Sequence, residues 1–341
     1  MEIKRKRRAL SLLAIVIISC LATGCSKTTK PLSHSIFAMD TVMDVTIYGD
    51  EEQLRDIENI VYSIEDELSV TNATSAVYQL NTAGSLVVDM ELASLVTRSL
   101  DLCKETDGAL DITIYPVSRA WGFTRGQYQV PDTSELNRLL ANVDYNGVST
   151  DICDNQTTIR LKSGKQVDFG SVAKGYAADR IVEYMASSGI SGGLINLGGN
   201  VHTYGTKPDG SLWKIGIANP ENVSEYVGYL ELTDRAVVTS GGYQRYFEQD
   251  GKIYHHIINP ATGYPADNDL ASVSVIGESG FMCDGLSTAL FVMGLDEAIN
   301  YWRDHGDFEL VLVDKAGNVY ITKGLERIFT SGEGVEVNII Y

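Results

Sequence analysis

Apolar residues recur at helical spacing in several stretches of the chain. In residues 51–68 they lie three or four positions apart, which predicts an amphipathic helix with one buried face. Gly189 follows another such stretch and supplies a C-terminal stop. The periodicity predicts helices over residues 51–68, 91–106, 134–141, 281–293 and 295–305, and one that opens within 168–176 and runs to 188.

Alternating polar and apolar residues predict strands between these helices. Residues 40–48 alternate strictly, as expected for a half-buried strand. Residues 158–168 predict a hairpin that turns at 163–164, and a tight turn at 250–251 predicts a second one. The remaining predicted strands are 194–200, 213–218, 226–232, 236–239, 246–248, 252–254, 271–276, 308–313 and 318–322.

The N-terminus begins with a basic segment that is followed by an apolar one. Five basic residues precede an apolar run at 9–21, and small residues then lead to Cys25. This order is typical of a bacterial lipoprotein signal, so we expect removal of residues 1–24, acylation of Cys25 and a tether at 25–35. Cys20 is a second possible acylation site. An uncleaved signal anchor is the alternative, although the apolar run is short for a membrane span.

The overall composition excludes several classes of protein. The 341 residues carry a formal net charge of -18, which disfavours non-specific binding to nucleic acid. An anionic substrate would also be repelled unless a metal ion or local donors offset the negative field. Beyond Cys25, the spacing of the cysteines fits neither a disulfide framework nor a zinc site, so we expect free, mostly buried thiols at Cys103, Cys153 and Cys283.

Residues 254–265 combine two adjacent histidines with two turns. His255 and His256 are two of only five histidines in the chain, and an Asn-Pro pair at 259–260 turns the chain soon after them. Successive residues of a strand face opposite sides, so only one of the two can face a given site. The alternative is a solvated histidine pair at the end of a strand.

Two predicted helices carry candidate ligand-binding groups. Residues 168–176 place small residues between a strand and a helix, which favours anion binding by free amides, although the spacing of a P-loop is absent. Asp284, Ser287 and Thr288 lie at positions i, i+3 and i+4 and therefore share one helix face. Their oxygens are ligands suited to Mg²⁺ or Ca²⁺. The alternative is an N-terminal carboxylate with two hydroxyls that bond back to the helix.

Eight short motifs occur in a fixed order along the chain. They are Met39-Asp40-Thr41, Gly108-Ala109-Leu110-Asp111, Trp121-Gly122-Phe123, residues 168–176, Asn196-Leu197-Gly198-Gly199-Asn200, Thr239-Ser240-Gly241, residues 256–265 and residues 284–288. In combination they resemble the ApbE-like FAD:protein FMN transferases, also described as flavin-trafficking lipoproteins. The resemblance spans about residues 36–330 and leaves 331–341 as a C-terminal extension. It implies a compact, T-fold-related α+β fold of mostly antiparallel sheets packed with helices, with a pocket for FAD.

The resemblance also implies roles for individual residues. His256 would assist the chemistry, with Asp284 as a second candidate base. The residues that would border FAD are Met39, Thr71, Ala109, Leu110, Asp111, Asp168, Lys174, Ile258 and Ser287. The residues that would ligate Mg²⁺ are Ser171, Asp284 and Thr288. The chain departs from many relatives at Ser69-Val70-Thr71, where those relatives carry Ser-Thr-Tyr, so a stacking aromatic is missing from this loop.

The activity implied by the resemblance is Mg²⁺-dependent transfer of FMN from FAD to a threonine hydroxyl of a partner protein, with release of AMP. The expected acceptor is a membrane-associated redox protein, and the expected location is the outer side of the cytoplasmic membrane. Two alternatives stay open at this point: hydrolysis of FAD to FMN and AMP, and carriage of flavin without chemistry.

Overall fold

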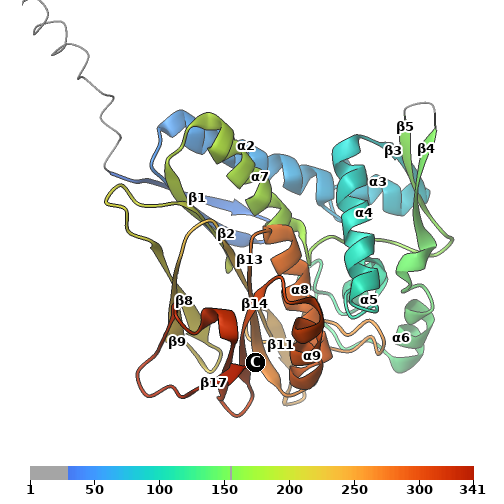
Figure 1. Cartoon of the computed structure of the whole chain (residues 1–341). Coiled ribbons are helices and arrows are strands. Elements are labelled where there is room, and N and C mark those ends of the chain that lie inside the picture. The colour runs from blue at the N-terminus through green and yellow to red at the C-terminus, as the bar shows by residue number, and fades with distance from the viewer. Residues whose placement is uncertain (1–29, 154–155) are drawn as a thin grey trace, which may run out of the picture.

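The computed structural model describes residues 30–153 and 156–341, and its largest element is a nine-stranded sheet (Figure 1). Neighbouring strands are antiparallel except for the last pair, which is parallel. The predicted α+β class with mostly antiparallel sheet is therefore confirmed. Across the sheet, the strands are β1 (Leu32–Ala38), β2 (Thr41–Ile47), β6 (Gly192–Leu197), β7 (Asn200–Gly205), β10 (Ala236–Gly241), β13 (Leu270–Gly277), β14 (Glu309–Asp314), β15 (Val319–Thr322) and β17 (Val337–Ile340).

Helices cover one face of this sheet and bury the larger apolar core against it. They are α2 (Glu51–Leu68), α7 (Ala173–Ser188), α8 (Gly280–Met293) and α9 (Leu295–His305). The observed bounds of these helices agree closely with the periodicity of the sequence. Local signals explain the agreement: Asp50 and Gln53 form a capping box before α2, and Gly189 ends α7 in the left-handed conformation.

A second, smaller sheet covers the other face. It contains β8 (Trp213–Asn219), β9 (Asn222–Leu232) and β16 (Phe329–Ser331), in the order β16-β9-β8. Trp213 and Leu230 of this sheet share a core with Val237 and Val311 of the large sheet. Alternate residues of the central strands therefore point into different cores.

A third group of elements lies beside the large sheet, on the right in Figure 1. Its three-stranded sheet has the order β3-β5-β4. The strands and helices of this group are β3 (Ser85–Val88), β4 (Val148–Cys153), β5 (Gln156–Leu161), α3 (Ala76–Ala83), α4 (Met90–Glu105), α5 (Tyr115–Ala120) and α6 (Thr133–Leu140). Short 3-10 turns occur at Ile112–Ile114, Tyr145–Gly147 and Lys323–Leu325.

The predicted hairpin over residues 158–168 is wrong in its pairing. The chain does turn near Gly164, but β5 pairs with β3 and β4, both of which precede it. After the turn, the backbone of Val167 bonds to the side chain of Asn81, at 2.7 Å from its N–H and 2.8 Å from its carbonyl. The side-chain amide thus replaces the ladder partner that a second strand would have supplied.

The predicted hairpin before the two histidines is confirmed. It consists of β11 (Tyr246–Gln249) and β12 (Lys252–His255), joined through Asp250 and Gly251, which both have positive φ. Trp121 anchors the loop that follows, because its indole N–H donates to the carbonyl of Gly263 at 2.7 Å. Trp121 thus belongs to a small aromatic core and does not line an open surface.

The folded unit reaches beyond residues 36–330 at both ends. Strand β1 begins at Leu32, within the segment expected to be a tether, and β17 lies within the expected C-terminal extension. In the described ranges no helix is long and apolar enough to span a membrane. The predicted signal and Cys25 lie outside these ranges. Cys103 and Cys283 are buried free thiols as expected, whereas Cys153 is a free thiol that is exposed.

Candidate functional site

The candidate site lies at one end of the large sheet, where several strand ends meet. The β1–β2 turn, the β6–β7 turn and the end of β10 are brought together because β1, β2, β6, β7 and β10 follow one another across the sheet and are antiparallel. The β1–β2 turn has positive φ at both Met39 and Asp40, which is uncommon for residues other than glycine. Gly198 and Gly199 form the β6–β7 turn, also with positive φ. Unusual backbone conformations therefore gather at this edge of the sheet.

Helices α7 and α8 cross over this edge in very close contact. A Cβ at Gly175 would lie 2.1 Å from the carbonyl oxygen of Gly280 and 2.7 Å from the Cβ of Asp284, so only glycine fits there. The amide of Gly175 donates to the Asp284 carboxylate at 2.8 Å. The contact between the helices thus places a buried carboxylate at the start of α7.

The prediction of free amides at residues 168–176 is wrong for Val172, Ala173 and Gly175. The amides of Val172 and Ala173 both donate to the carbonyl of Phe169, at 2.9 and 2.8 Å, and Gly175 donates to Asp284. The start of α7 does attract an anion, as the helix dipole favours, but that anion is a side chain of the protein itself.

Asp284, Ser287 and Thr288 share one face of α8 as predicted, but both hydroxyls bond back to the Asp284 carbonyl, as the alternative expected. Their role as metal ligands stays a prediction. Ser287 Oγ lies 2.8 Å from Ser240 Oγ of β10 and donates to the carbonyl of Asp284 at 2.9 Å. Thr288 Oγ1 lies 3.5 Å from the same Ser240 hydroxyl and 3.4 Å from the Asp284 carbonyl, so its hydrogen bonds are long. The hydroxyl of Thr288 is therefore the less firmly committed of the two and the easier to turn toward a ligand.

Lys174 is the cation around which the ionisable groups of the site are arranged. Burial raises the pKa of Asp284, and the positive charge of Lys174 partly opposes that rise. Burial likewise raises the pKa of Asp168, against the amide of Gly170, Arg245 and Lys174. Among the described residues no carboxylate lies within 4.0 Å of the Lys174 ammonium. The ammonium of Lys174 is thus available to an anionic ligand.

His256 faces the same positive charges. Burial, together with Lys174 and Arg245, lowers the pKa of His256 to about 4 despite a hydrogen bond to the backbone. That bond joins its Nδ1 to the carbonyl of Arg245 at 3.1 Å. A carbonyl can only accept, so Nδ1 carries the proton and Nε2 keeps its lone pair. The site therefore holds a neutral imidazole with Nε2 as the basic nitrogen.

His255 turns away from His256, as predicted for neighbouring strand residues. Its Nε2 lies 3.0 Å from the carbonyl of Ala266, and its ring packs edge-on against Phe291 of α8. His256 instead lies edge-on to Phe123. The solvated pair that was the alternative is excluded, because both rings are at least half-buried and bonded to backbone.

The loop at residues 109–113 borders the site through the backbone. The amide of Asp168 donates to the carbonyl of Ile112 at 2.8 Å, and a Cβ at Gly285 would lie 3.5 Å from Leu110, so the loop packs between the Asp168 segment and α8. The Asp111 carboxylate accepts from the amide and hydroxyl of Thr113 at 2.8 and 2.6 Å. Its other oxygen accepts from the amide of Tyr145 at 3.1 Å. Asp111 thus holds the loop in shape, Leu110 is buried in the core, and Ala109 is partly exposed.

The remaining predicted flavin contacts fall into two groups. Met39 is held at the β1–β2 turn by Glu65, which accepts from its amide at 2.7 Å, and Ile258 lies buried in the aromatic core beneath the histidines. Both are adjacent to the site. Thr71 is exposed and shares hydrogen bonds only with Ser69, within its own loop, in the described part of the chain. Its contact with flavin stays a prediction.

A divalent cation fits the oxygens at the α7–α8 contact. The described ranges contain no group of three or more His, Cys, Asp or Glu side chains that could hold a metal ion. Asp284 supplies one buried carboxylate, the partly exposed Thr288 hydroxyl lies one turn along α8, and the partly exposed Ser171 hydroxyl lies just before α7. One carboxylate with neutral oxygens suits Mg²⁺, which usually keeps several waters and binds substrate phosphates.

Two residues of the site were not among the predicted ones. Arg245 presents its carbonyl to His256, its guanidinium bonds to the carbonyl of Phe123, and Nη2 lies 3.8 Å from the Asp40 carboxylate. Asn200 is buried beneath α8, and neither polar atom of its amide has a hydrogen-bond partner in the described residues. An unsatisfied buried amide costs about 1–3 kcal/mol. The only sequence signals for these two residues were the position of Arg245 directly before a strand and that of Asn200 directly after two glycines.

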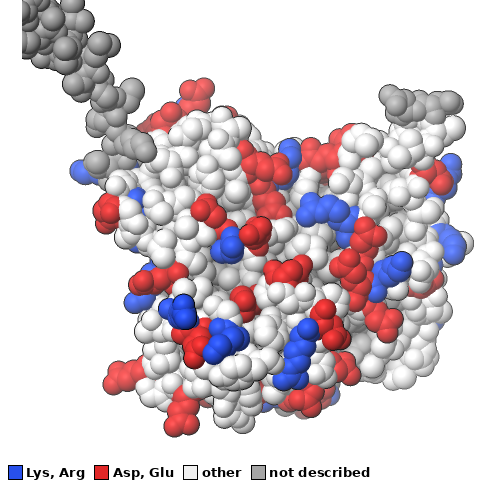
Figure 2. Space-filling view, viewed as in Figure 1, with Lys and Arg blue, Asp and Glu red and all other residues white. Residues whose placement is uncertain are grey.

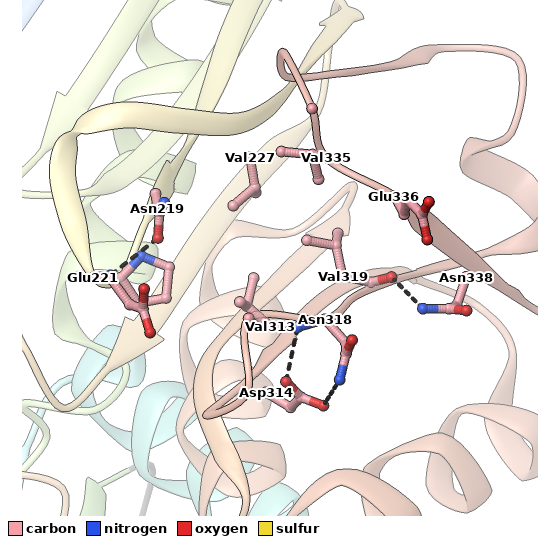
Figure 3. Close-up of a pocket in the computed structure, with 13 residues that line it drawn as sticks. Asn219, Glu221, Val227, Val313, Asp314, Asn318, Val319, Val335, Glu336 and Asn338 are labelled. Atoms are coloured by element: carbon pink, nitrogen blue, oxygen red, sulfur yellow. Dashed lines mark hydrogen bonds between the residues drawn. The ribbon is translucent and has the colours of Figure 1, made fainter.

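A cavity in the described residues lies elsewhere. It has a volume of about 340 Å³ and lies between the β8–β9 turn and the β14–β15 turn (Figure 3). Glu221 and Glu336 line it, and Asp314 is committed to the turn through Asn318, at 2.8 Å from both its backbone and its side-chain nitrogen. Its acidic lining disfavours a phosphate ligand. Figure 2 shows acidic and basic side chains interspersed on the surface, with no broad basic area on that face.

Comparison with known proteins identifies related chains. The sequence model of the ApbE family matches residues 39–312. A FAD:protein FMN transferase of Klebsiella pneumoniae (strain 342) is 32% identical over 85% of this chain and 91% of its own length. The FAD:protein FMN transferase of Escherichia coli (strain K12) is 31% identical over 75% of this chain and 74% of its own length.

Solved structures agree with these relatives. The ApbE protein of Thermotoga maritima superposes with a TM-score of 0.82 at 30% identity, covering 88% of this chain and 99% of that one. The apo flavinyl transferase ApbE of Pseudomonas stutzeri superposes with a TM-score of 0.78 at 28% identity, covering 89% of this chain and 98% of that one. The correspondence extends over nearly the whole of both solved chains.

The lowered pKa of His256 predicts how stability depends on pH. In the unfolded chain the imidazole has its ordinary pKa of 6.5, and in the folded site about 4. Between these values the unfolded state binds more protons, so the free energy of unfolding falls as the pH falls from 6.5 to 4, by about 3 kcal/mol in the limit. Chemical denaturation of the wild type and of His256→Gln should show that the substitution removes this part of the pH dependence. His305→Gln, at an exposed position of α9, is the control. Identical pH profiles for the wild type and His256→Gln would contradict the buried, neutral imidazole.

Proposed function

This chain belongs to the ApbE family and is an enzyme that transfers flavin from FAD to a protein, and we propose that the acceptor atom is a threonine hydroxyl and that Mg²⁺ assists the reaction. The observation that carries the proposal is the grouping of a neutral imidazole, a buried carboxylate and an ammonium that has no carboxylate partner in the described part of the chain, contributed by His256, Asp284 and Lys174. These groups match the needs of phosphoryl transfer: a base, a positive charge and a metal ligand.

The reaction exchanges the phosphoanhydride bond of the diphosphate for a phosphate ester. The threonine oxygen attacks the phosphorus on the FMN side of the diphosphate, and the bond from that phosphorus to the oxygen of AMP breaks. FMN is then esterified to the threonine, and AMP leaves with the bridging oxygen. The proton of the hydroxyl must go to a base as the new bond forms.

His256 is the better candidate for that base. Its Nδ1 is committed to the Arg245 carbonyl, which leaves the lone pair of Nε2 to accept the proton. Its lowered pKa keeps the ring neutral at physiological pH, so the accepting form is the resting form. Asp284 is the poorer candidate, because its carboxylate already accepts from the amide of Gly175.

Other residues of the chain handle the negative charge of the diphosphate. The ammonium of Lys174 is free of close carboxylates among the described residues and would bind phosphate oxygens. Asp284, Ser171 and Thr288 would hold Mg²⁺, which when bound neutralises and polarises a diphosphate. Ala109, Leu110 and Met39 would border the flavin. A net charge of -18 makes this local concentration of positive charge necessary for an anionic substrate.

We also propose that the protein acts on the outer side of the cytoplasmic membrane, attached through a lipid on Cys25. This proposal is supported by the basic, apolar and small-residue order of the N-terminus. The acceptor would then be a membrane-associated redox protein that presents a threonine on the same side.

The first prediction concerns the product. Incubation of a candidate acceptor with FAD, Mg²⁺ and the enzyme should raise the acceptor mass by one FMN, and fragmentation should locate the added mass on a threonine. Replacement of that threonine by valine is the control and should abolish the mass gain. Free FMN and AMP with an unmodified acceptor would indicate hydrolysis, and unchanged FAD would indicate carriage.

The second prediction concerns His256. His256→Ala should slow transfer by roughly 10²–10⁴-fold, because general-base catalysis contributes about that much. FAD affinity should persist, since the diphosphate contacts and the flavin surface are untouched. His255→Ala is the matched control: it should perturb packing against Phe291 but slow transfer much less. A loss of rate that follows entirely from lost FAD binding would make His256 a binding residue, and equal small losses in both variants would make the pair structural.

The third prediction concerns the membrane anchor. Cys25→Ala should leave an unprocessed precursor or release the protein from membranes, as judged by mass and by fractionation of cells. Cys20→Ala is the control and should be processed normally. Normal processing and membrane association of the Cys25 variant would show that the lipid is attached to another residue or that the protein carries no lipid.

A further inference from the structure

Asn200, the first residue of β7, has an environment that the fold alone does not explain. Its side chain is 1% exposed, yet neither Nδ2 nor Oδ1 makes a hydrogen bond to any described residue. Buried primary amides are normally satisfied, because an unpaired one loses its hydration without compensation. An orphaned amide at this position therefore points to a ligand or a bound water that completes its hydrogen bonds.

The direction of the Asn200 side chain follows from the alternation of β7. His202, two residues along, lies 3.8 Å from the Asp179 carboxylate of α7 and so faces the helices. Val201 packs instead in the core shared with the second sheet. Residues two apart on a strand share a face, so Asn200 also faces α7 and α8.

On that face α8 carries the buried carboxylate of Asp284. Strand β7 contacts α8 directly, and Asn200 pairs with Val238 of β10, two residues before Ser240. The Ser240 hydroxyl lies 2.8 Å from that of Ser287, and Asp284 is one turn before Ser287 on α8, so Asn200 faces the turn that carries Asp284. The geometry nevertheless falls short of a complete hydrogen bond. The second carboxylate contact, from the Gly175 amide at 2.8 Å, is complete. The Asp284 carboxylate is thus fixed by the Gly175 amide, whereas the Asn200 amide lies on its other side without a complete hydrogen bond.

The backbone around Asn200 is held firmly. Gly198 and Gly199 precede it with positive φ, and the amide of Gly199 donates to Asn196 Oδ1 at 2.9 Å. Asn200 is then paired with Leu197 and Val238 on the two neighbouring strands. The amide is therefore presented by a rigid turn, which is the arrangement expected of a group that orients another.

We propose that Asn200 is a positioning residue of the divalent-cation site: its Nδ2 donates to the Asp284 carboxylate and holds it toward the ion. The inference rests on the proposed function, since it requires Mg²⁺ at Asp284. In this proposal Asn200 touches neither the flavin nor the attacking oxygen, and it acts only through Asp284, the ligand of the ion. Groups that orient metal ligands in this way commonly change metal affinity 10–100-fold when removed.

The test compares metal affinity with the stability of the metal-free fold. Asn200→Leu keeps the branching and the number of side-chain heavy atoms and removes the unsatisfied amide, so the metal-free protein should melt at the same temperature as the wild type or higher. Its Mg²⁺ affinity, measured by calorimetry with Mg²⁺ alone and with FAD present, should fall 10–100-fold, and the rise in melting temperature on adding Mg²⁺ should shrink.

Ser272→Ala is the matched control. Ser272 is fully buried on β13, its hydroxyl is also without a partner among the described residues, and it is two residues from Ser274, which bonds at 2.7 Å to Thr239 on the sheet face opposite α8. Removal of that hydroxyl should leave Mg²⁺ affinity unchanged.

The outcomes separate the inference from the function on which it rests. A wild type that does not bind Mg²⁺ would refute the metal in the proposed function. A wild type that binds Mg²⁺, with Asn200→Leu binding it equally well, would refute the role of Asn200 alone. A metal-free Asn200→Leu that melts far below the wild type while keeping its affinity would show that the amide serves the fold.

Discussion

The site depends on the contact between α7 and α8. Two glycines, Gly175 and Gly280, allow the backbones to approach so closely that the α7 amide at Gly175 reaches a side chain of α8. That hydrogen bond, reinforced by the helix dipole, stabilises the buried charge of Asp284 without a salt bridge. Any side chain larger than hydrogen at Gly175 would separate the helices and withdraw the carboxylate from its donor.

The electrostatics of the site follow from that arrangement. Burial disfavours charge on Asp284, Asp168 and His256 alike, and Lys174 favours the charged form of the two acids while disfavouring that of the imidazole. One half-buried ammonium thus helps to keep two acids ionised and one base neutral. A base, a positive charge and a carboxylate then coexist within an otherwise strongly acidic protein. The protein meets an anionic substrate with a local positive field and not with its overall charge.

Much of the fold was predictable from local patterns. The bounds of α2 and α9 follow from apolar periodicity and from end signals such as the capping box of Asp50 and Gln53. The β11–β12 hairpin follows from Asp250-Gly251, whose positive φ values suit a tight turn. The pairing of β5 was not predictable. The segment after the turn does not pair with β5, because the side chain of Asn81, which is distant in sequence, hydrogen-bonds to the backbone of Val167 where a strand was expected.

The sequence by itself determined which residues could carry the chemistry: a histidine pair of which only one can face the site, and a helix face with one carboxylate and two hydroxyls. These conclusions depend on periods of 2 and 3.6 residues, which are properties of a single element. Only the tertiary structure decided that the Gly175 amide is taken by Asp284, that Arg245 sets the tautomer of His256, and that the Asn200 amide has no partner among the described residues. Each of these joins groups from different elements, and local sequence carries no signal for a hydrogen bond whose partner is distant along the chain.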